Sequence, residues 1–208
     1  MTDGPHPPAL FLLSPANLTG VRGGRILGGT SGAPFMETLR AGGRVPLGDV
    51  YASVSSLYFR GKRAYADAFA RPGPDGVGNL VITPDAGLLP VDEPVDLETL
   101  RRFAETDIAA GNETYAIPLL EDARRVDGTV GDRSSVGLLG SIASDKYLEP
   151  LAGVFGRRLL FPEPFIGRGD MSRGGLLLRA VEAGEELPYV VAVDAERRGE
   201  RPPRLPPR

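Results

Sequence analysis

Cysteine is absent from the 208 residues, and histidine occurs once, as His6 in a proline-rich stretch. Without cysteine the chain can form neither a disulfide nor a thiolate metal site. Because His6 lies in that stretch, a Ser-His-Asp triad and a histidine metal site are excluded as well. Acid–base chemistry must then come from carboxylates, tyrosines, lysine or the backbone, and we expect no metal and no cofactor.

Lysine is almost absent too. Of the 24 basic residues, all but Lys62 and Lys146 are arginine. In a chain that uses arginine wherever any cation serves, the remaining lysines are candidates for work that arginine cannot do. Such work is the loss of a proton or the presentation of a compact ammonium group.

Long apolar runs are missing from the sequence. None approaches the roughly 18 residues of a membrane span, and the N-terminus lacks the pattern of a signal peptide. We therefore expect a cytoplasmic protein with no membrane partner. The formal charge of −3 does not indicate a binder of duplex DNA and favours a free nucleotide over it.

Short apolar runs that alternate with helical patterns predict the fold. The strands are expected at residues 9–13, 79–83, 136–139, 158–161 and 189–193. Such alternation predicts a single α/β domain over residues 9–194, with a mixed or mainly parallel sheet flanked by helices. Residues 1–8 are expected to form a flexible leader, and the Arg/Pro-rich residues 195–208 a flexible, extended tail.

The glycine-rich residues 20–32 are expected to form a loop. Their spacing matches neither a Walker phosphate loop nor a Rossmann fingerprint. The short apolar strand before them stops at Ser14, so Ser14 and Asn17 would lie at a strand's carboxyl end. Open α/β sheets bind their ligands at such ends.

Residues 50–70 predict a helix, with Gly61 as a possible break. Tyr58, Lys62, Tyr65 and Phe69 recur at helical spacing and share one face. Two interpretations remain open. Either the face is a core-facing aromatic stripe past which Lys62 reaches solvent, or the lysine lies beside the rings in a partly dry cleft that lowers its pKa.

Residues 165–179 combine arginines, a carboxylate, a hydroxyl and glycines just before an apolar helix. Asp170 or Ser172 is expected to cap that helix. Unpaired N–H groups at its start, together with Arg168 and Arg173, would form an anion site. The alternative is an ordinary capped helix with solvated arginines.

Five short motifs in order carry a family resemblance. They are LLSPA at 12–16, YFRGK at 58–62 followed by Tyr65, GLLPVD at 87–92, ASDKY at 143–147 and RGDMSR at 168–173. Their order resembles that of the YaaA family of bacterial peroxide-stress proteins. The chain departs from the family where its Phe-Lys-Gly lysine falls on Arg60, in its short length and in lacking a clear helix-hairpin-helix. The resemblance implies a compact α/β fold with a central cleft and association with nucleic acid or nucleotides.

The first functional hypothesis is an N-glycosylase, a hydrolase that cleaves a base–sugar bond in DNA or a nucleoside. A carboxylate would stabilise the oxocarbenium-like transition state, with Asp170 as the first candidate and Asp92 as the second. Lys62 would support the leaving base or attack the sugar as an amine. The candidate substrate-binding residues are Ser14, Asn17, Tyr58, Arg60, Tyr65, Ser144, Tyr147, Arg168, Ser172 and Arg173. We expect Ser14, Tyr58, Lys62, Asp170 and Arg173 to line one pocket.

Two alternatives stay open. One is a non-catalytic DNA-binding stress protein, in which arginines contact phosphates and affinity falls steeply with salt. Its candidate phosphate contacts are Arg22, Arg25, Arg60, Arg63, Arg168 and Arg173. The other is an enzyme that acts on a free nucleotide or nucleoside. The oligomeric state is not predicted.

Overall fold

The elements of the fold follow one another as alternating strands and helices in the computed structural model, which describes residues 7–73 and 76–205. The strands are β1 (Pro8–Leu13), β2 (Val45–Pro46), β3 (Asn79–Ile82), β4 (Leu88–Pro90), β5 (Pro94–Val95), β6 (Ser135–Leu139), β7 (Leu159–Pro162) and β8 (Tyr189–Val191). The helices are α1 (Val21–Leu27), α2 (Met36–Arg40), α3 (Leu47–Val54), α4 (Ser56–Phe69), α5 (Leu97–Glu105), α6 (Glu113–Val130), α7 (Asp145–Phe155) and α8 (Asp170–Ala183), with short 3₁₀ turns η1 (Gly156–Arg158) and η2 (Glu163–Phe165).

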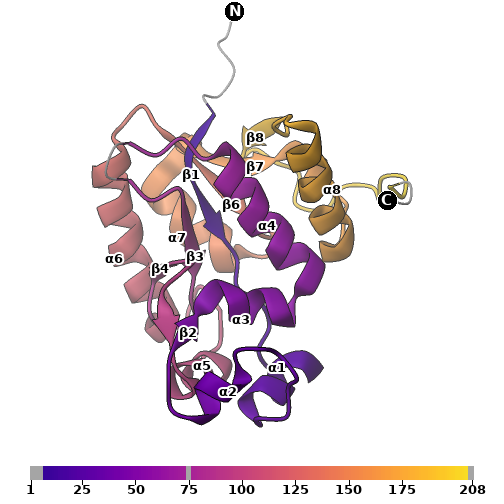
Figure 1. The fold of residues 1–208 in the computed structure, drawn as a ribbon. Helices are drawn as coiled ribbons and strands as arrows, with labels where there is room; N and C mark the ends of the chain where they lie inside the picture. The colour runs from indigo at the N-terminus through magenta and orange to yellow at the C-terminus, as the bar shows by residue number, and fades with distance from the viewer. Residues whose placement is uncertain (1–6, 74–75, 206–208) are drawn as a thin grey trace, which may run out of the picture.

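A six-stranded sheet runs through the centre in the order β4-β3-β1-β6-β7-β8 (Figure 1). Strands β3, β1, β6 and β7 are parallel to one another, whereas the edge strands β4 and β8 pair antiparallel with β3 and β7. Strands β2 and β5 form a separate two-stranded sheet. This architecture confirms the predicted α/β fold with a mainly parallel, mixed sheet.

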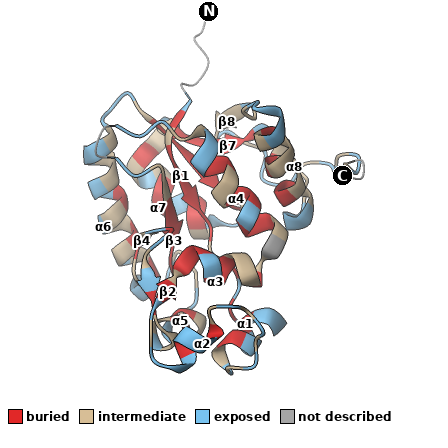
Figure 2. Ribbon diagram, viewed as in Figure 1, coloured by how far each residue is buried: buried red, intermediate tan, exposed pale blue. Residues whose placement is uncertain are grey.

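Helices cover both faces of the sheet. Helices α3, α4 and α8 lie on one face, and α6 and α7 pack together on the other (Figure 1). The inner strands are buried on both sides (Figure 2), which is why they read as continuous apolar runs rather than alternating ones. Helices α1, α2 and α5 gather below the carboxyl ends of the parallel strands (Figure 1).

Two expectations about local structure are wrong. The glycine-rich residues 20–32 contain the helix α1 rather than only a loop. Glycine is required at position 23 because a side chain there would collide with the Leu18 backbone. The expected helix over residues 50–70 is two helices, α3 and α4, and the break is at Ser55 rather than at Gly61. The short strands β2, β4 and β5 were not predicted.

Gly61 instead allows α4 and α8 to cross with their backbones in contact. A Cβ on Gly61 would lie 2.8 Å from the carbonyl oxygen of Gly174, and one on Gly174 would lie 2.7 Å from that of Leu57. Glycine is the residue that permits such an approach. The crossing fixes the first turns of α8 beside the middle of α4.

The described part of the tail, residues 195–205, has no helix or strand but lies against the domain. The Nη1 atom of Arg168 donates to the carbonyl of Pro203 at 3.2 Å, and Arg197 pairs with Asp145 at 2.6 Å. Gly167, with φ of +70°, has the backbone of Glu200 where a side chain would project. These contacts attach the tail to the first residue of α7 and to the loop before α8. Of the expected leader, residues 1–6 lie outside the described residues, and Pro8 begins β1.

Adjacent glycines in α8 test the crossing. Gly174→Ala should lower the free energy of unfolding by about 1–3 kcal/mol, because its Cβ meets the backbone of α4. Gly175→Ala should leave it unchanged or raise it by up to about 1 kcal/mol, because that Cβ has room and alanine favours helix. Urea unfolding of both variants measures the difference. Equal effects of the two substitutions would contradict the close crossing.

Candidate functional site

A cavity of about 760 Å³ opens where the parallel strands β1, β3 and β6 end. The connection from β1 returns to β3 through helices on one face of the sheet, whereas β6 continues to β7 through α7 on the other. The loops after β1 and β6 therefore diverge, which is the arrangement that creates ligand sites in α/β sheets. The volume lies within the range of pockets for small ligands.

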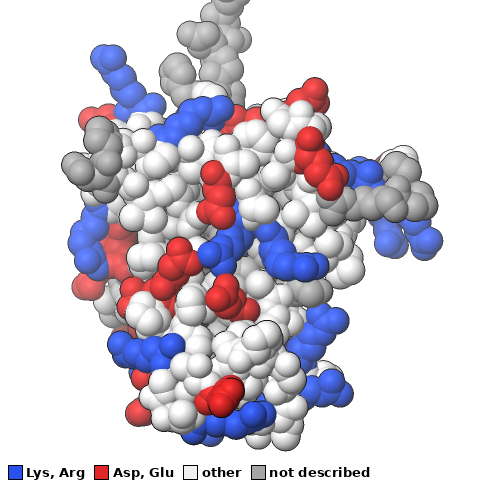
Figure 3. All heavy atoms as spheres, in the orientation of Figure 1, with Lys and Arg blue, Asp and Glu red and all other residues white. Residues whose placement is uncertain are grey.

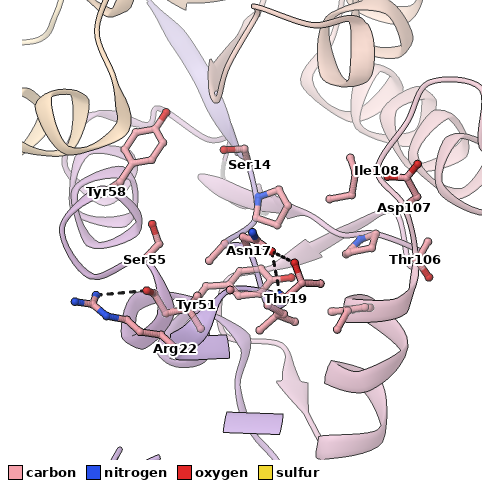
Figure 4. A pocket seen from close by; sticks show the side chains of 18 of the residues that line it. Ser14, Asn17, Thr19, Arg22, Tyr51, Ser55, Tyr58, Thr106, Asp107 and Ile108 are labelled. Carbon is pink, nitrogen blue, oxygen red and sulfur yellow. Dashed lines mark hydrogen bonds between the residues drawn. The ribbon is translucent and has the colours of Figure 1, made fainter. Parts of the chain in front are cut away.

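Six parts of the chain contribute to the cavity wall. Figure 4 shows Tyr58, Ser55 and Arg22 on one side and Thr106, Asp107 and Ile108 on the other, with Ser14 and Asn17 between them. The starts of α7 and α8 complete the lining with Lys146, Tyr147 and Asp170.

Lys62 lies directly behind this wall. Its Nζ donates to the carbonyl oxygen of Ser14 at 2.5 Å and to the Ser14 Oγ at 3.0 Å. It also lies 4.4 Å from the centre of the Tyr58 ring and 5.0 Å from that of Phe59. The residue is 1% exposed, so the aromatic face of α4 does not let the amine reach solvent. The second interpretation of the stripe, a lysine held beside rings in a dry setting, describes this geometry.

The surroundings of Lys62 shift its proton affinity. Burial lowers the pKa of its amine to about 7, the carboxylate of Asp170 acts in the opposite direction, and the guanidinium of Arg173 lowers it further. A group with a pKa near neutrality can both give and take a proton at physiological pH. Arginine could not do this, which fits the scarcity of lysine in the sequence.

Two buried tyrosine hydroxyls in the lining have no partner. The hydroxyls of Tyr51 and Tyr58 make no hydrogen bond to the described part of the protein. Burial raises the pKa of both, and also that of Tyr147, so all three stay neutral and can donate. An unpaired buried donor is costly, which favours a polar ligand that accepts from these hydroxyls.

Asp170 is the first residue of α8 and lies at the rim of the cavity. The expectation that it or Ser172 caps the helix is wrong, because Gly169 occupies the N-cap position and no side chain bonds there. The Asp170 side chain is exposed, and its carboxylate makes no capping hydrogen bond to the helix. It is close enough to affect the pKa of Lys62, Tyr58 and Tyr147.

The two arginines around α8 donate hydrogen bonds to backbone carbonyls and do not face the cavity. The Arg173 guanidinium donates to the carbonyl of Phe165 at 3.1 and 3.2 Å and to that of Gly140 at 3.4 Å, and the residue is buried. Arg168 donates to the Pro164 carbonyl and to the Ser172 Oγ, at 3.0 and 3.1 Å. Neither arginine lines the cavity, so the expected anion site is not formed by them.

Several other sequence candidates also lie outside the cavity lining. Asp92, whose side chain is 72% exposed, pairs with Arg63 at 2.8 Å. The Tyr65 hydroxyl lies 2.7 Å from that of Tyr189 and accepts from the Leu187 N–H at 2.8 Å. The exposed residues Arg60 and Ser144 and the partly buried Ser172 do not line the cavity either. Of the five residues expected to share a pocket, Ser14, Tyr58 and Asp170 line it, and Lys62 and Arg173 lie behind it.

Two features were missed as parts of this site. Tyr51 lines the cavity, but no motif in the neighbouring sequence indicates a functional role for it. Arg22, named above only for the DNA-binding alternative, lines both this cavity and a second hollow of about 370 Å³. That hollow is also lined by Arg25, Thr30, Ser31 and Ser53. An anion beside the cavity would find two guanidinium groups there.

Comparisons with known proteins add no relative. No family model, no curated protein and no solved structure matches this chain. Within residues 7–73 and 76–205, no three His, Cys, Asp or Glu side chains are grouped so as to hold a metal ion. None of the helices in this part of the chain has the length and apolar character needed to cross a membrane.

The buried amine makes stability depend on pH. Its pKa is lowered from 10.5 in the unfolded chain to about 7 in the folded one, so the unfolded state binds one more proton between these values. The cost of burying Lys62 is therefore complete below pH 7 and disappears as the pH rises toward 10.5. Lys62→Met should gain stability relative to the wild type at low pH. This advantage should shrink with rising pH by at most about 1.4 kcal/mol per unit. Denaturant unfolding across this range measures it, and a pH-independent difference would contradict the shift.

Proposed function

We propose that this protein is an N-glycosylase, a hydrolase that cleaves the base–sugar bond of a nucleotide or of a nucleotide unit in DNA. One observation carries the proposal. The uncommitted carboxylate of Asp170 shares a cavity with the Ser14 hydroxyl, which is in turn bonded to the buried Lys62. A carboxylate and a proton-bearing group that face one cavity are the two elements that glycosidic hydrolysis requires.

The carboxylate would act on the sugar. As the base–sugar bond breaks, positive charge develops on the anomeric carbon and ring oxygen, and the Asp170 carboxylate stabilises this charge. Asp170 then accepts a proton from the attacking water. Its position at the rim, where it neither caps the helix nor pairs with a cation of the described residues, leaves its oxygens free for this role.

The tyrosines would bind the base. Tyr58 and Tyr147 belong to the lining, and stacking on aromatic rings is a general way to hold a nucleobase. The unpartnered hydroxyls of Tyr51 and Tyr58 can donate to ring nitrogens or carbonyls of the base. The resemblance to the YaaA family supports a nucleotide-like substrate as well.

A phosphate would lie in the arginine-lined hollow. Arg22 belongs to both the cavity and the hollow, so a base and sugar in one can carry a phosphate into the other. Basic and acidic side chains are intermixed over the face shown in Figure 3, which favours contact with one or a few phosphates rather than with a long duplex. The same hollow also fits binding without chemistry, the second candidate function.

The test is an assay for released base. Nucleosides, their 5′-monophosphates in the ribo and deoxyribo series, and DNA with a set of modified bases are each incubated with the full chain. Mass spectrometry then detects the free base. The proposal predicts release from at least one substrate, and faster release from a nucleotide than from its nucleoside. Binding without release would favour the second candidate.

Two aspartates provide a matched comparison. Asp170→Asn should lower turnover by about 100- to 1,000-fold, because the amide cannot stabilise positive charge, while unfolding stays unchanged. Asp92→Asn removes only a surface pair with Arg63 and should leave turnover unchanged. The release assay and urea unfolding measure both variants. Normal turnover of Asp170→Asn would remove the carboxylate from the mechanism.

A further inference from the structure

The hydrogen bonds around Ser14 fix the direction in which its hydroxyl can act. The Lys62 Nζ donates to the Ser14 carbonyl and to the Ser14 Oγ, so the Oγ lone pair accepts from the amine. The hydrogen on Oγ is then left to point elsewhere, and Ser14 lines the cavity. Ser14 is itself buried, with its backbone held by the Leu139 carbonyl at 3.1 Å. The hydroxyl is thus a positioned donor between the amine and the ligand space.

We propose that Ser14 donates the proton to the departing base and that Lys62 resupplies it, so that the two residues form a proton relay. This inference rests on the proposed base–sugar cleavage and adds the acid that the reaction needs. Ser14 is the residue that touches the substrate, and Lys62 acts through it. The geometry points to an acid because both bonds between the two residues run from the Lys62 amine to an oxygen of Ser14.

The step balances in atoms and charge. The bond between the anomeric carbon and the base nitrogen breaks, and its electron pair goes to the nitrogen. That nitrogen takes the Ser14 hydroxyl proton while Oγ takes one from the Lys62 ammonium. Water adds to the anomeric carbon and gives its proton to Asp170. The products are the free base and the sugar, and the proton on Asp170 returns to the Lys62 amine through solvent.

Polar, aromatic and charged groups around Lys62 keep its ammonium form accessible. The Ser14 carbonyl and the rings of Tyr58 and Phe59 contact the amine, and all three favour a cation. From α8, the carboxylate of Asp170 favours the proton, and Arg173 opposes it. A serine nucleophile would need the reverse bond, with Oγ donating to a neutral amine. It would also leave a covalent adduct on Ser14.

The relay is tested by comparing two substrates, one whose leaving group needs a proton and one whose leaving group does not. One substrate is the member of the nucleotide panel that the wild type cleaves fastest. The other carries 4-nitrophenol in place of the base, which departs as an anion. Ser14→Ala and Lys62→Met should each lower kcat/KM for the nucleotide by about 100-fold or more, in the range of acid catalysis. Release of nitrophenolate should change far less. In the wild type, only nucleotide cleavage should decline as the pH rises past about 7.

Ser134→Ala, just before β6 and outside the cavity lining, serves as the matched control and should cleave both substrates normally. Equal losses on both substrates, or the same pH profile for both, would overturn the relay alone. A covalent Ser14 adduct in mass spectra of the wild type during turnover would also overturn it. Failure of the wild type to cleave any member of the panel would contradict the relay and the proposed function together.

Discussion

A buried amine held against the end of the first strand is the interaction on which the site depends. An ammonium group in a dry interior is unfavourable, so its partners must be fixed in place. The Ser14 carbonyl and hydroxyl provide those partners, and the core strand β1 holds them rigidly. On the other side, the contact between Gly61 and Gly174 brings α8 against α4, so that Asp170 reaches the same neighbourhood. Packing thus determines how far the carboxylate and the amine lie from each other.

The two ionisable groups have opposite environments. Asp170 is exposed at the rim, whereas Lys62 is buried behind the wall, where burial lowers the pKa of its amine. Neighbouring groups with separate environments are how proteins maintain an acid and a base in one site at the same pH. The two arginines around α8, Arg168 and Arg173, do not line the cavity. Arg173 instead fastens the loop before α8 to the end of β6, which keeps the arrangement in position.

Sequence patterns predicted the parts that follow from local physics. The continuous apolar runs gave β1, β3, β6 and β7, and the helical spacing of Tyr58, Lys62 and Tyr65 gave their common face. Local physics also explains the start of α5, where the Asp96 side chain caps the helix by accepting from the Thr99 N–H. The sequence could not show that Asp92 and Tyr65 have structural partners. Only the tertiary fold brings Asp92 to an ion pair with Arg63, and the Tyr65 hydroxyl to a hydrogen bond with that of Tyr189. The α1 helix was missed because Gly23 is needed for contact with the Leu18 backbone, not for a loop.

The most direct test of the account is the titration of Lys62 itself. The chain has two lysines, so protein grown with lysine labelled with ¹³C at Cε gives two NMR signals, and Lys62→Arg assigns them. The account predicts that the Lys62 signal titrates with a midpoint of about 7 and moves in Ser14→Ala. A Lys62 signal that is still fully protonated at about pH 9, as for an unperturbed lysine, would contradict it.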